Sequence, residues 1–274
     1  MKRYDLKPQK RFGQNFLVDS NILRRIVESG AAEEGGQVFE VGAGLGVLTL
    51  ALSQAVGVNG KVVSVECDTR LIPVLNETLS EIPQITIVEG DVMKLNLAKQ
   101  FEQRFDPSKK IGVIANIPYQ ITSPLIASLI EQKESISTMV FLVQKEVAQR
   151  LAANAGSSDY GAFTLFCQYH AEVENLFMVP RTVFYPMPEV TSAVIRLTVR
   201  QAPPVEVASE ETLFAVIRAA FGQRRKTISN ALSGNPALGW DKDKASQALR
   251  TARIDPARRG ETLTLAEFAK IANA

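Results

Sequence analysis

Apolar residues in this chain gather in short continuous runs that are separated by stretches of helical periodicity. The runs have the length and composition of buried strands, and they are residues 38–41, 61–66, 85–89, 111–115 and 138–143. The stretches with apolar residues at helical spacing are residues 20–30, 45–56, 69–82 and 123–132. Strands that alternate with helices predict a parallel sheet covered by helices, which is an α/β fold.

The pattern changes in the last third of the chain. A further helix is expected from residue 144, residues 163–169 fit a helix better than a strand, and residues 191–199 have the alternation of a strand. After the linker Gln201-Ala202-Pro203-Pro204 only helical periodicity follows, at residues 211–221, 226–232, 242–251 and 264–272. We therefore predict two domains, residues 1–200 with the sheet and residues 201–274 with helices alone.

Composition narrows the class of protein. The 274 residues are 46% hydrophobic and 22% charged, as in ordinary globular enzymes, and no apolar run reaches the length of a membrane span. The N-terminus lacks the apolar core of a secretory signal. Cys67 and Cys167 are expected to be reduced thiols, and the single His170 cannot build a metal site. These features predict a cytoplasmic protein that uses no metal.

Positive charge is clustered although the net charge is only +2. Lys10 and Arg11 belong to a basic N-terminus, and Arg224-Arg225-Lys226 form a second basic group. Basic clusters on a nearly neutral chain indicate a polyanionic partner such as RNA. The alternative is solvated charge without a partner.

A glycine-rich turn follows the first predicted strand. Gly42-Ala43-Gly44-Leu45-Gly46 places its third glycine one residue too early for the dinucleotide fingerprint, with Val47 at the expected position. Glu40 would repel a pyrophosphate but suits a ligand with a cationic end. S-adenosylmethionine carries a sulfonium and an amino group but no phosphate, so the turn favours it over NAD.

Two acids follow at the ends of the next strands. Glu66 lies about 20 residues beyond the glycines, where a carboxylate can accept both ribose hydroxyls. Asp91 follows the third strand and could accept a hydrogen bond from the adenine amine. Either acid alone would be read as surface charge. Together, at the edge where ligands bind in open α/β sheets, they favour a cofactor site.

The fourth strand leads into Asn116-Ile117-Pro118-Tyr119. Asn116 can accept a hydrogen bond from an exocyclic amine, Tyr119 can stack on a base, and Pro118 fixes the backbone between them. The alternative is ordinary turn chemistry after a strand. Its position at the same sheet edge as the two acids favours an active site.

Five motifs occur together along the chain: Gln14-Asn15-Phe16-Leu17, Glu40–Gly46, Asn116–Tyr119, Phe184–Val190 and Phe221–Thr227. As a set they resemble the ribosomal RNA adenine dimethyltransferases, in particular the bacterial branch that acts near the 3′ end of small-subunit rRNA. The resemblance implies a Rossmann-like class I S-adenosylmethionine-dependent methyltransferase sheet with a small helical C-terminal domain. It also implies an enzyme that methylates the N6 amines of two adjacent adenosines in the loop of the 3′-terminal hairpin of 16S rRNA, within the assembling small ribosomal subunit.

The resemblance assigns roles to individual residues. The expected cofactor contacts are Gln14, Asn15, Leu17, Gly42, Glu66, Asp91 and Asn116, to which the glycine turn adds Glu40 and Gly44. Asn116 and the carbonyl of Ile117 would accept the two amine hydrogens, and Tyr119 and Phe184 would stack on the target base. Lys10, Arg11, Arg224, Arg225 and Lys226 would hold the RNA backbone. A monomer is expected.

The chain departs from the family pattern at two positions. Gln120 replaces the usual Asn after the Tyr, and Met187 interrupts a run of prolines. Three alternatives remain. They are a 23S rRNA dimethyltransferase that confers macrolide resistance, a non-catalytic ribosome assembly factor on the same fold, and a more distant NAD-dependent oxidoreductase. The motif Phe221–Lys226 favours the small-subunit enzyme, and the paired Asn116 and Tyr119 favour catalysis.

Overall fold

The structure is a computed structural model that describes residues 4, 6–9, 12–30, 32–118, 121–223 and 225–274. The chain forms two compact units. The first contains Met1–Ala148 and Val173–Val199, and the second contains Gln149–Glu172 and Arg200–Ala274. The predicted division at residue 200 had placed residues 149–172 in the first domain, whereas their contacts group them with the C-terminal helices.

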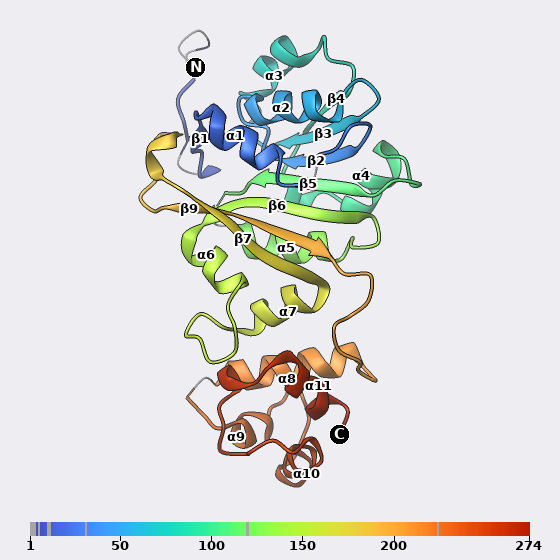
Figure 1. The fold of residues 1–274 in the computed structure, drawn as a ribbon, viewed down its shortest axis with the longest axis vertical. Coiled ribbons are helices and arrows are strands. Elements are labelled where there is room, and N and C mark those ends of the chain that lie inside the picture. The colour runs from blue at the N-terminus through green and yellow to red at the C-terminus, as the bar shows by residue number, and fades with distance from the viewer. Residues whose placement is uncertain (1–3, 5, 10–11, 31, 119–120, 224) are drawn as a thin grey trace. The chain divides into compact units, whose positions relative to one another are not determined.

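The first unit is built on a sheet that has, among the described residues, seven strands in the order β4-β3-β2-β5-β6-β9-β7 (Figure 1). The strands are β2 (Gln37–Val41), β3 (Lys61–Glu66), β4 (Ile85–Glu89), β5 (Ile111–Asn116), β6 (Ile136–Gln144), β7 (Ala171–Val179) and β9 (Ser192–Val199). Neighbours from β4 to β6 are parallel, and β9 is antiparallel to β6. The chain moves outward from β2 in one direction and from β5 in the other. Such a reversal opens a ligand crevice at the carboxyl ends of these strands.

Helices cover both faces of this sheet. They are α1 (Ser20–Val27), α2 (Val47–Val56), α3 (Ile72–Leu79), α4 (Leu97–Arg104) and α5 (Thr122–Ile130). Successive residues of β2 point to opposite faces. Val38 packs in one cluster with Ile22 of α1 and Leu52 of α2, whereas the Phe39 ring meets the Phe101 ring of α4 edge-on at 5.1 Å. Each such buried side chain contributes about 1.5–3 kcal/mol, so the strand is held between two hydrophobic layers.

The α/β fold and each predicted strand are confirmed, and residues 163–169 belong to a helix as predicted. Among the longer elements, α4 and β7 were not predicted from the sequence pattern. Along α4 only Leu97 and Phe101 are buried, so its apolar face is too narrow to stand out. Strand β7 lies at one edge of the sheet and is at least partly exposed along most of its length, so it lacks a continuous apolar run.

A second, two-stranded sheet also escaped prediction. Strand β1 (Phe16–Leu17) pairs antiparallel with β8 (Phe184–Tyr185), with Phe16 opposite Tyr185 and Leu17 opposite Phe184. Two residues are too few to leave a periodic pattern. The pairing brings two of the motifs noted above, from opposite parts of the chain, side by side.

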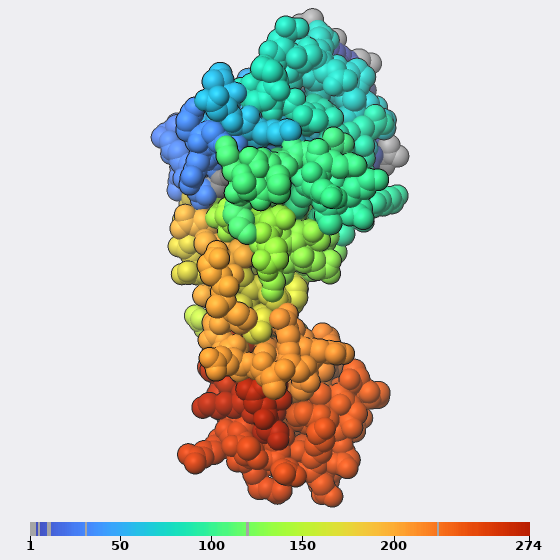
Figure 2. Space-filling model, turned by 90° about the vertical axis from the view of Figure 1, so that its right-hand side faces the viewer, coloured from blue at the N-terminus to red at the C-terminus, as the bar shows by residue number. Residues whose placement is uncertain are grey.

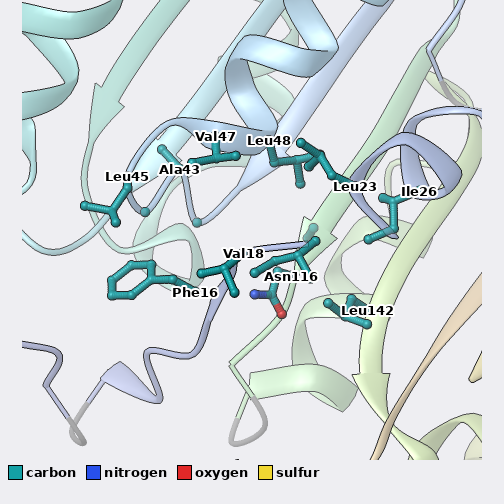
Figure 3. Close-up of a pocket in the computed structure, with 14 residues that line it drawn as sticks. Phe16, Val18, Leu23, Ile26, Ala43, Leu45, Val47, Leu48, Asn116 and Leu142 are labelled. Carbon is teal, nitrogen blue, oxygen red and sulfur yellow. The ribbon is translucent and has the colours of Figure 1, made fainter. Parts of the chain in front are cut away.

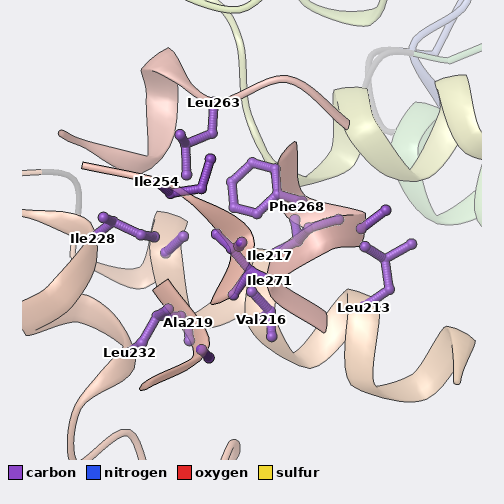
Figure 4. Packing of buried hydrophobic residues seen from close by; sticks show 14 of the residues in the cluster. Leu213, Val216, Ile217, Ala219, Ile228, Leu232, Ile254, Leu263, Phe268 and Ile271 are labelled. Atoms are coloured by element: carbon purple, nitrogen blue, oxygen red, sulfur yellow. The ribbon is translucent and has the colours of Figure 1, made fainter. Parts of the chain in front are cut away.

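The second unit is helical. Its helices include α7 (Ala162–His170), α8 (Glu210–Gly222), α9 (Ile228–Leu232), α10 (Lys242–Ala252) and α11 (Leu265–Ala272), while α6 (Lys145–Leu151) crosses the division between the units. In the space-filling view, the residues from α8 to α11 are coloured orange to red and form one compact body (Figure 2). The fully buried ring of Phe268 lies among Ile217, Ile254 and Leu263 (Figure 4). No helix in the described part of the chain combines the length and apolarity needed to cross a membrane.

Candidate active site

The glycine turn lies directly after β2. Gly42 and Gly44 have φ angles of +84° and +58°, in the left-handed region that L-residues with a Cβ rarely adopt. A Cβ on Gly44 would approach the Phe16 ring to 3.3 Å. Backbone conformation therefore favours glycine at both positions, and at Gly44 the Phe16 ring leaves little space for a side chain.

Glu66, the last residue of β3, is hydrogen-bonded to the glycine turn. One of its carboxylate oxygens accepts the backbone N–H of Gly44 at 2.8 Å, and the other accepts that of Asp68 at 2.7 Å. Burial raises the pKa of Glu66, although these backbone donors oppose the shift. Each carboxylate oxygen has a further lone pair, and Glu66 lines a cavity. The carboxylate is thus fixed in position beside the cavity, and its role as acceptor of ribose hydroxyls stays a prediction.

Two adjoining cavities lie at the carboxyl edge of the sheet. The larger, of about 340 Å³, is mostly apolar. Figure 3 shows residues of the glycine turn and α2 above this cavity, with Phe16, Val18 and Asn116 facing them from below. The smaller cavity, of about 80 Å³, is lined by polar groups of Gln14, Asn15 and Glu66 among others. Phe16, Gly42, Gly44 and Asn116 line both cavities, which therefore form one continuous site.

Asn116 is the last residue of β5 and lies at the centre of this site. Its Nδ2 donates to the carbonyl of Asn15 at 3.0 Å, so the amide has a fixed orientation and Oδ1 is left to accept. The next backbone N–H, that of Ile117, donates to Leu142 on β6 at 3.2 Å. The structure therefore holds the Asn116 motif from two sides. Tyr119 lies outside the described residues, and so does Gln120, which departs from the family pattern.

The N-terminal segment that contains Gln9, Gln14 and Asn15 is hydrogen-bonded to Asp68, which follows β3. Gln14 Nε2 donates to Asp68 Oδ2 at 2.8 Å, while Gln14 Oε1 accepts the backbone N–H of Gln9 at 2.8 Å. The Arg70 guanidinium also binds this carboxylate, and its hydrogen bonds hold the pKa of Asp68 below its usual value. Asp68 was not predicted from the sequence, although an acid two residues after Glu66 and two before Arg70 is consistent with an ion pair.

Glu40 occupies a different place from the one predicted. It is fully buried and lines neither cavity. Oε2 accepts the hydroxyls of Thr49 on α2 and Ser64 on β3, while Oε1 is buried with no hydrogen-bond partner among the described residues. Burial raises the pKa of Glu40 to about 7. This geometry makes Glu40 a support beneath the turn, and direct contact with the cofactor would require it to become exposed.

Two other predicted residues also stand apart from the cavities. Asp91 accepts the backbone N–H of Met93 at 3.0 Å and so caps a short 3₁₀ turn. Burial, together with the charges of Glu66 and Asp91, raises the pKa of the Cys67 thiol to about 11. Phe184 is only 5% exposed and packs in the same cluster as Leu17, whereas the adjacent Tyr185 is 58% exposed. Stacking of Phe184 on a base would require a different side-chain position.

The predicted basic residues are described only in part. Arg225 and Lys226 are exposed in the second unit, where they line a hollow of about 490 Å³ with Phe221, Gly222 and Gln223. Lys10, Arg11 and Arg224 lie outside the described residues. Within the described chain, no group of three or more His, Cys, Asp or Glu side chains is arranged to hold a metal ion.

The chain is similar to proteins of a known family over nearly its whole length. The family model of the ribosomal RNA adenine dimethylases matches residues 6–273. The chain belongs to this family. As a member of this family it is an S-adenosylmethionine-dependent rRNA adenine dimethyltransferase, and the predicted resemblance is confirmed.

Relatives of known name support the bacterial branch. The chain is 46% identical to ribosomal RNA small subunit methyltransferase A of Geobacillus thermodenitrificans and 44% identical to that of Bacillus cytotoxicus, covering 100% of this chain and 93% of each relative.

Solved structures share the fold over nearly the whole chain. A dimethyladenosine transferase from Plasmodium falciparum aligns with a TM-score of 0.77 at 25% identity, covering 93% of this chain and 95% of the other. The 23S rRNA methyltransferase ErmE aligns with a TM-score of 0.71 at 26% identity, covering 94% and 98%. The class I methyltransferase fold predicted from the motifs is thereby confirmed.

Proposed function

We propose that this protein transfers methyl groups from S-adenosylmethionine to the N6 amines of two adjacent adenosines in the loop of the 3′-terminal hairpin of 16S rRNA. The substrate would be the assembling small ribosomal subunit, and the protein would act in the cytoplasm as a monomer without a metal. The observation that carries the proposal is the fixed Asn116 amide, which lies on the edge shared by the two cavities. Relatives named small subunit methyltransferase A support the choice of subunit.

The site fits the methyl donor. The glycine turn leaves room that a Cβ at Gly44 would fill, and Glu66 offers lone pairs for ribose hydroxyls beside it. The apolar lining of the larger cavity suits an uncharged part of the ligand such as the adenine ring or the methionine chain. No cationic side chain lines either cavity among the described residues, which agrees with a ligand that lacks phosphate. S-adenosylmethionine supplies an electrophilic methyl group on a sulfonium when bound.

The chain's own contribution is orientation of the amine. An exocyclic adenine amine is a poor nucleophile because its lone pair is delocalised into the ring. Asn116 Oδ1 accepts one amine hydrogen and the Ile117 carbonyl accepts the other, so that the lone pair can leave the ring plane and point towards the methyl group. No strong base is required, because the proton leaves after attack. Orientation of this kind can supply up to about 7–11 kcal/mol.

The target base must leave its stack to reach Asn116. Tyr119 would then stack on the base, and Phe184 would do so after a change of rotamer that frees its ring from the core. Leu17 and Phe184 are paired across the small β1–β8 sheet, so the cofactor site and the base site share one support. Lys10, Arg11, Arg224, Arg225 and Lys226 would bind RNA phosphates, which would make affinity depend on salt.

Methyl transfer to unmethylated small and large ribosomal subunits tests the proposal. We expect tritiated methyl groups on 16S rRNA only. Transfer to 23S rRNA would instead support the alternative of a 23S rRNA methyltransferase, the activity that names ErmE. Asn116→Ala should abolish dimethyladenosine detected by mass spectrometry even at saturating S-adenosylmethionine. Undiminished dimethylation by that variant would exclude the assigned role of Asn116, and no transfer by the wild-type protein to either subunit would favour a non-catalytic assembly factor.

A further inference from the structure

A third cavity lies beside the candidate active site and has no role in the mechanism above. It measures about 480 Å³ and is entirely within the first unit. Its lining comes from the loop after β8, from Gln144 at the end of β6 and from the N-terminal segment. Gly13, Gln14 and Asn15 line both this cavity and the smaller cofactor cavity. The two spaces are therefore separated by a few residues, one of which is the hydrogen-bond partner of Asn116.

The loop presents a group of exposed apolar side chains to this cavity. Tyr185, Met187 and Val190 are 58%, 56% and 41% exposed. The loop is held at both ends, because Tyr185 is paired in the β1–β8 sheet and Arg181 Nη1 donates to the carbonyl of Glu189 at 2.7 Å. An exposed aromatic ring on a fixed backbone is a suitable platform for stacking an unpaired base.

The polar groups of the cavity fit the edge of a base better than a phosphate. Gln144 lies two residues beyond Leu142, which is in register with Asn116, so its amide lies at the same sheet edge. A Gln amide can both accept from the adenine N6 amine and donate to N7. The Glu189 carboxylate also accepts from an exocyclic amine but repels a phosphate. The combination of stacking ring, amide and carboxylate favours a base with an exocyclic amine, and the amide pairing suits adenine.

We propose that this cavity binds the unpaired adenosine adjacent to the target, with its ring on Tyr185 and its Watson–Crick or Hoogsteen edge at Gln144 and Glu189. This inference rests on the proposed function, since the target itself must lie at Asn116. The neighbour would hold the strand in register while the target amine is methylated. The sequence pattern alone did not predict this role for Tyr185, Gln144 or Glu189.

Coupling between the ring and the neighbouring base tests the proposal. Small subunits would be reconstituted with 16S rRNA that carries an abasic residue in place of one of the two adenosines, and methylation of the other would be measured. We expect Tyr185→Ala to lower kcat/KM about tenfold or more on normal rRNA, and the abasic rRNA to lower it equally for the wild-type protein. The two changes combined should cost no more than either alone. Additive losses would show that Tyr185 does not bind the neighbour and would overturn the proposal.

Tyr185→Phe is the matched control, because it retains a stacking ring and should stay within about twofold of wild type. A loss equal to that of Tyr185→Ala would overturn the stacking role. Tyr185 lines neither cofactor cavity, so both variants should bind S-adenosylmethionine as the wild-type protein does. Weakened cofactor binding in Tyr185→Ala would instead assign the loop to the support of the cofactor site and would contradict the inference.

Base identity provides a second arm. Replacing the neighbouring adenine by purine, which lacks the exocyclic amine, should lower methylation by the wild-type protein about tenfold. Gln144→Leu should lose that preference. A wild-type protein that methylates both rRNAs equally would refute recognition of the amine. Failure of the proposed function is distinguishable from these outcomes, because a wild-type protein that methylates no small subunit would give no rate to compare.

Discussion

Removal of the Asp68 carboxylate should weaken cofactor binding, although this side chain lines neither cofactor cavity. In the structure Asp68 is nearly inaccessible to solvent, and it binds both Arg70 and Gln14. Gln14 lies in the segment that carries Asn15, whose carbonyl in turn fixes the Asn116 amide. Asp68→Ala therefore releases the N-terminal segment from the edge of the cofactor site without altering any residue that lines it.

The size of the effect follows from one hydrogen bond. The bond from Gln14 Nε2 to Asp68 Oδ2 is 2.8 Å long, and a hydrogen bond to a charged group is worth about 1.5–3 kcal/mol. In the variant the released segment must be ordered when the cofactor binds. The binding free energy of the cofactor therefore falls by the free energy of the lost hydrogen bond. The dissociation constant of S-adenosylmethionine should then rise by about 10- to 150-fold. Asp68→Asn, which can still accept one hydrogen bond, should give a smaller rise.

Isothermal titration calorimetry with S-adenosylmethionine measures this directly, and circular dichroism verifies the fold of each variant. Asp106→Ala is the matched control, because Asp106 caps an exposed turn through Ser108 and lines no cofactor cavity. The control should bind the cofactor like the wild-type protein. A folded Asp68→Ala protein with unchanged affinity would refute the argument that Asp68 positions the N-terminal segment for binding.

Three further predictions follow from individual residues. Burial raises the pKa of Glu40 from 4.5 to about 7. Between these pH values the folded state binds more protons than the unfolded state, so the free energy of unfolding falls as pH rises, by at most about 3 kcal/mol. Urea unfolding of Glu40→Gln should lack this fall. Arg225→Ala combined with Lys226→Ala should reduce the slope of log affinity for rRNA against log salt by about 1.5, whereas an unchanged slope would identify these side chains as solvated charge. Phe268→Ala should destabilise the helical unit by about 3–5 kcal/mol in urea titrations followed by circular dichroism, and a loss below about 1 kcal/mol would show that the core refills the space.

Much of the fold could be predicted from local patterns. The central strands are buried on both faces, so each is a continuous apolar run that is bounded by turn residues. The partly exposed β7 and the narrow apolar face of α4 left no such signal. Residues 149–172 group by contacts with the C-terminal unit, whereas the predicted division followed the linker at Pro203 and Pro204, which marks a change in composition and not the limits of packing.

The sequence by itself determined the residues available for the chemistry: the early third glycine, the acids after β3 and β4, and the Asn116 motif at the end of β5. These depend on strand ends, and the carboxyl ends of parallel strands must meet at one edge. Only the tertiary structure decided which of them line a cavity, because exposure depends on what packs above each side chain. It placed Glu40 beneath the turn and Phe184 in the core. It also brought Asp68 into hydrogen-bond contact with Gln14, and it placed Tyr185 and Asn15 in the lining of a third cavity, through contacts between residues far apart in the chain.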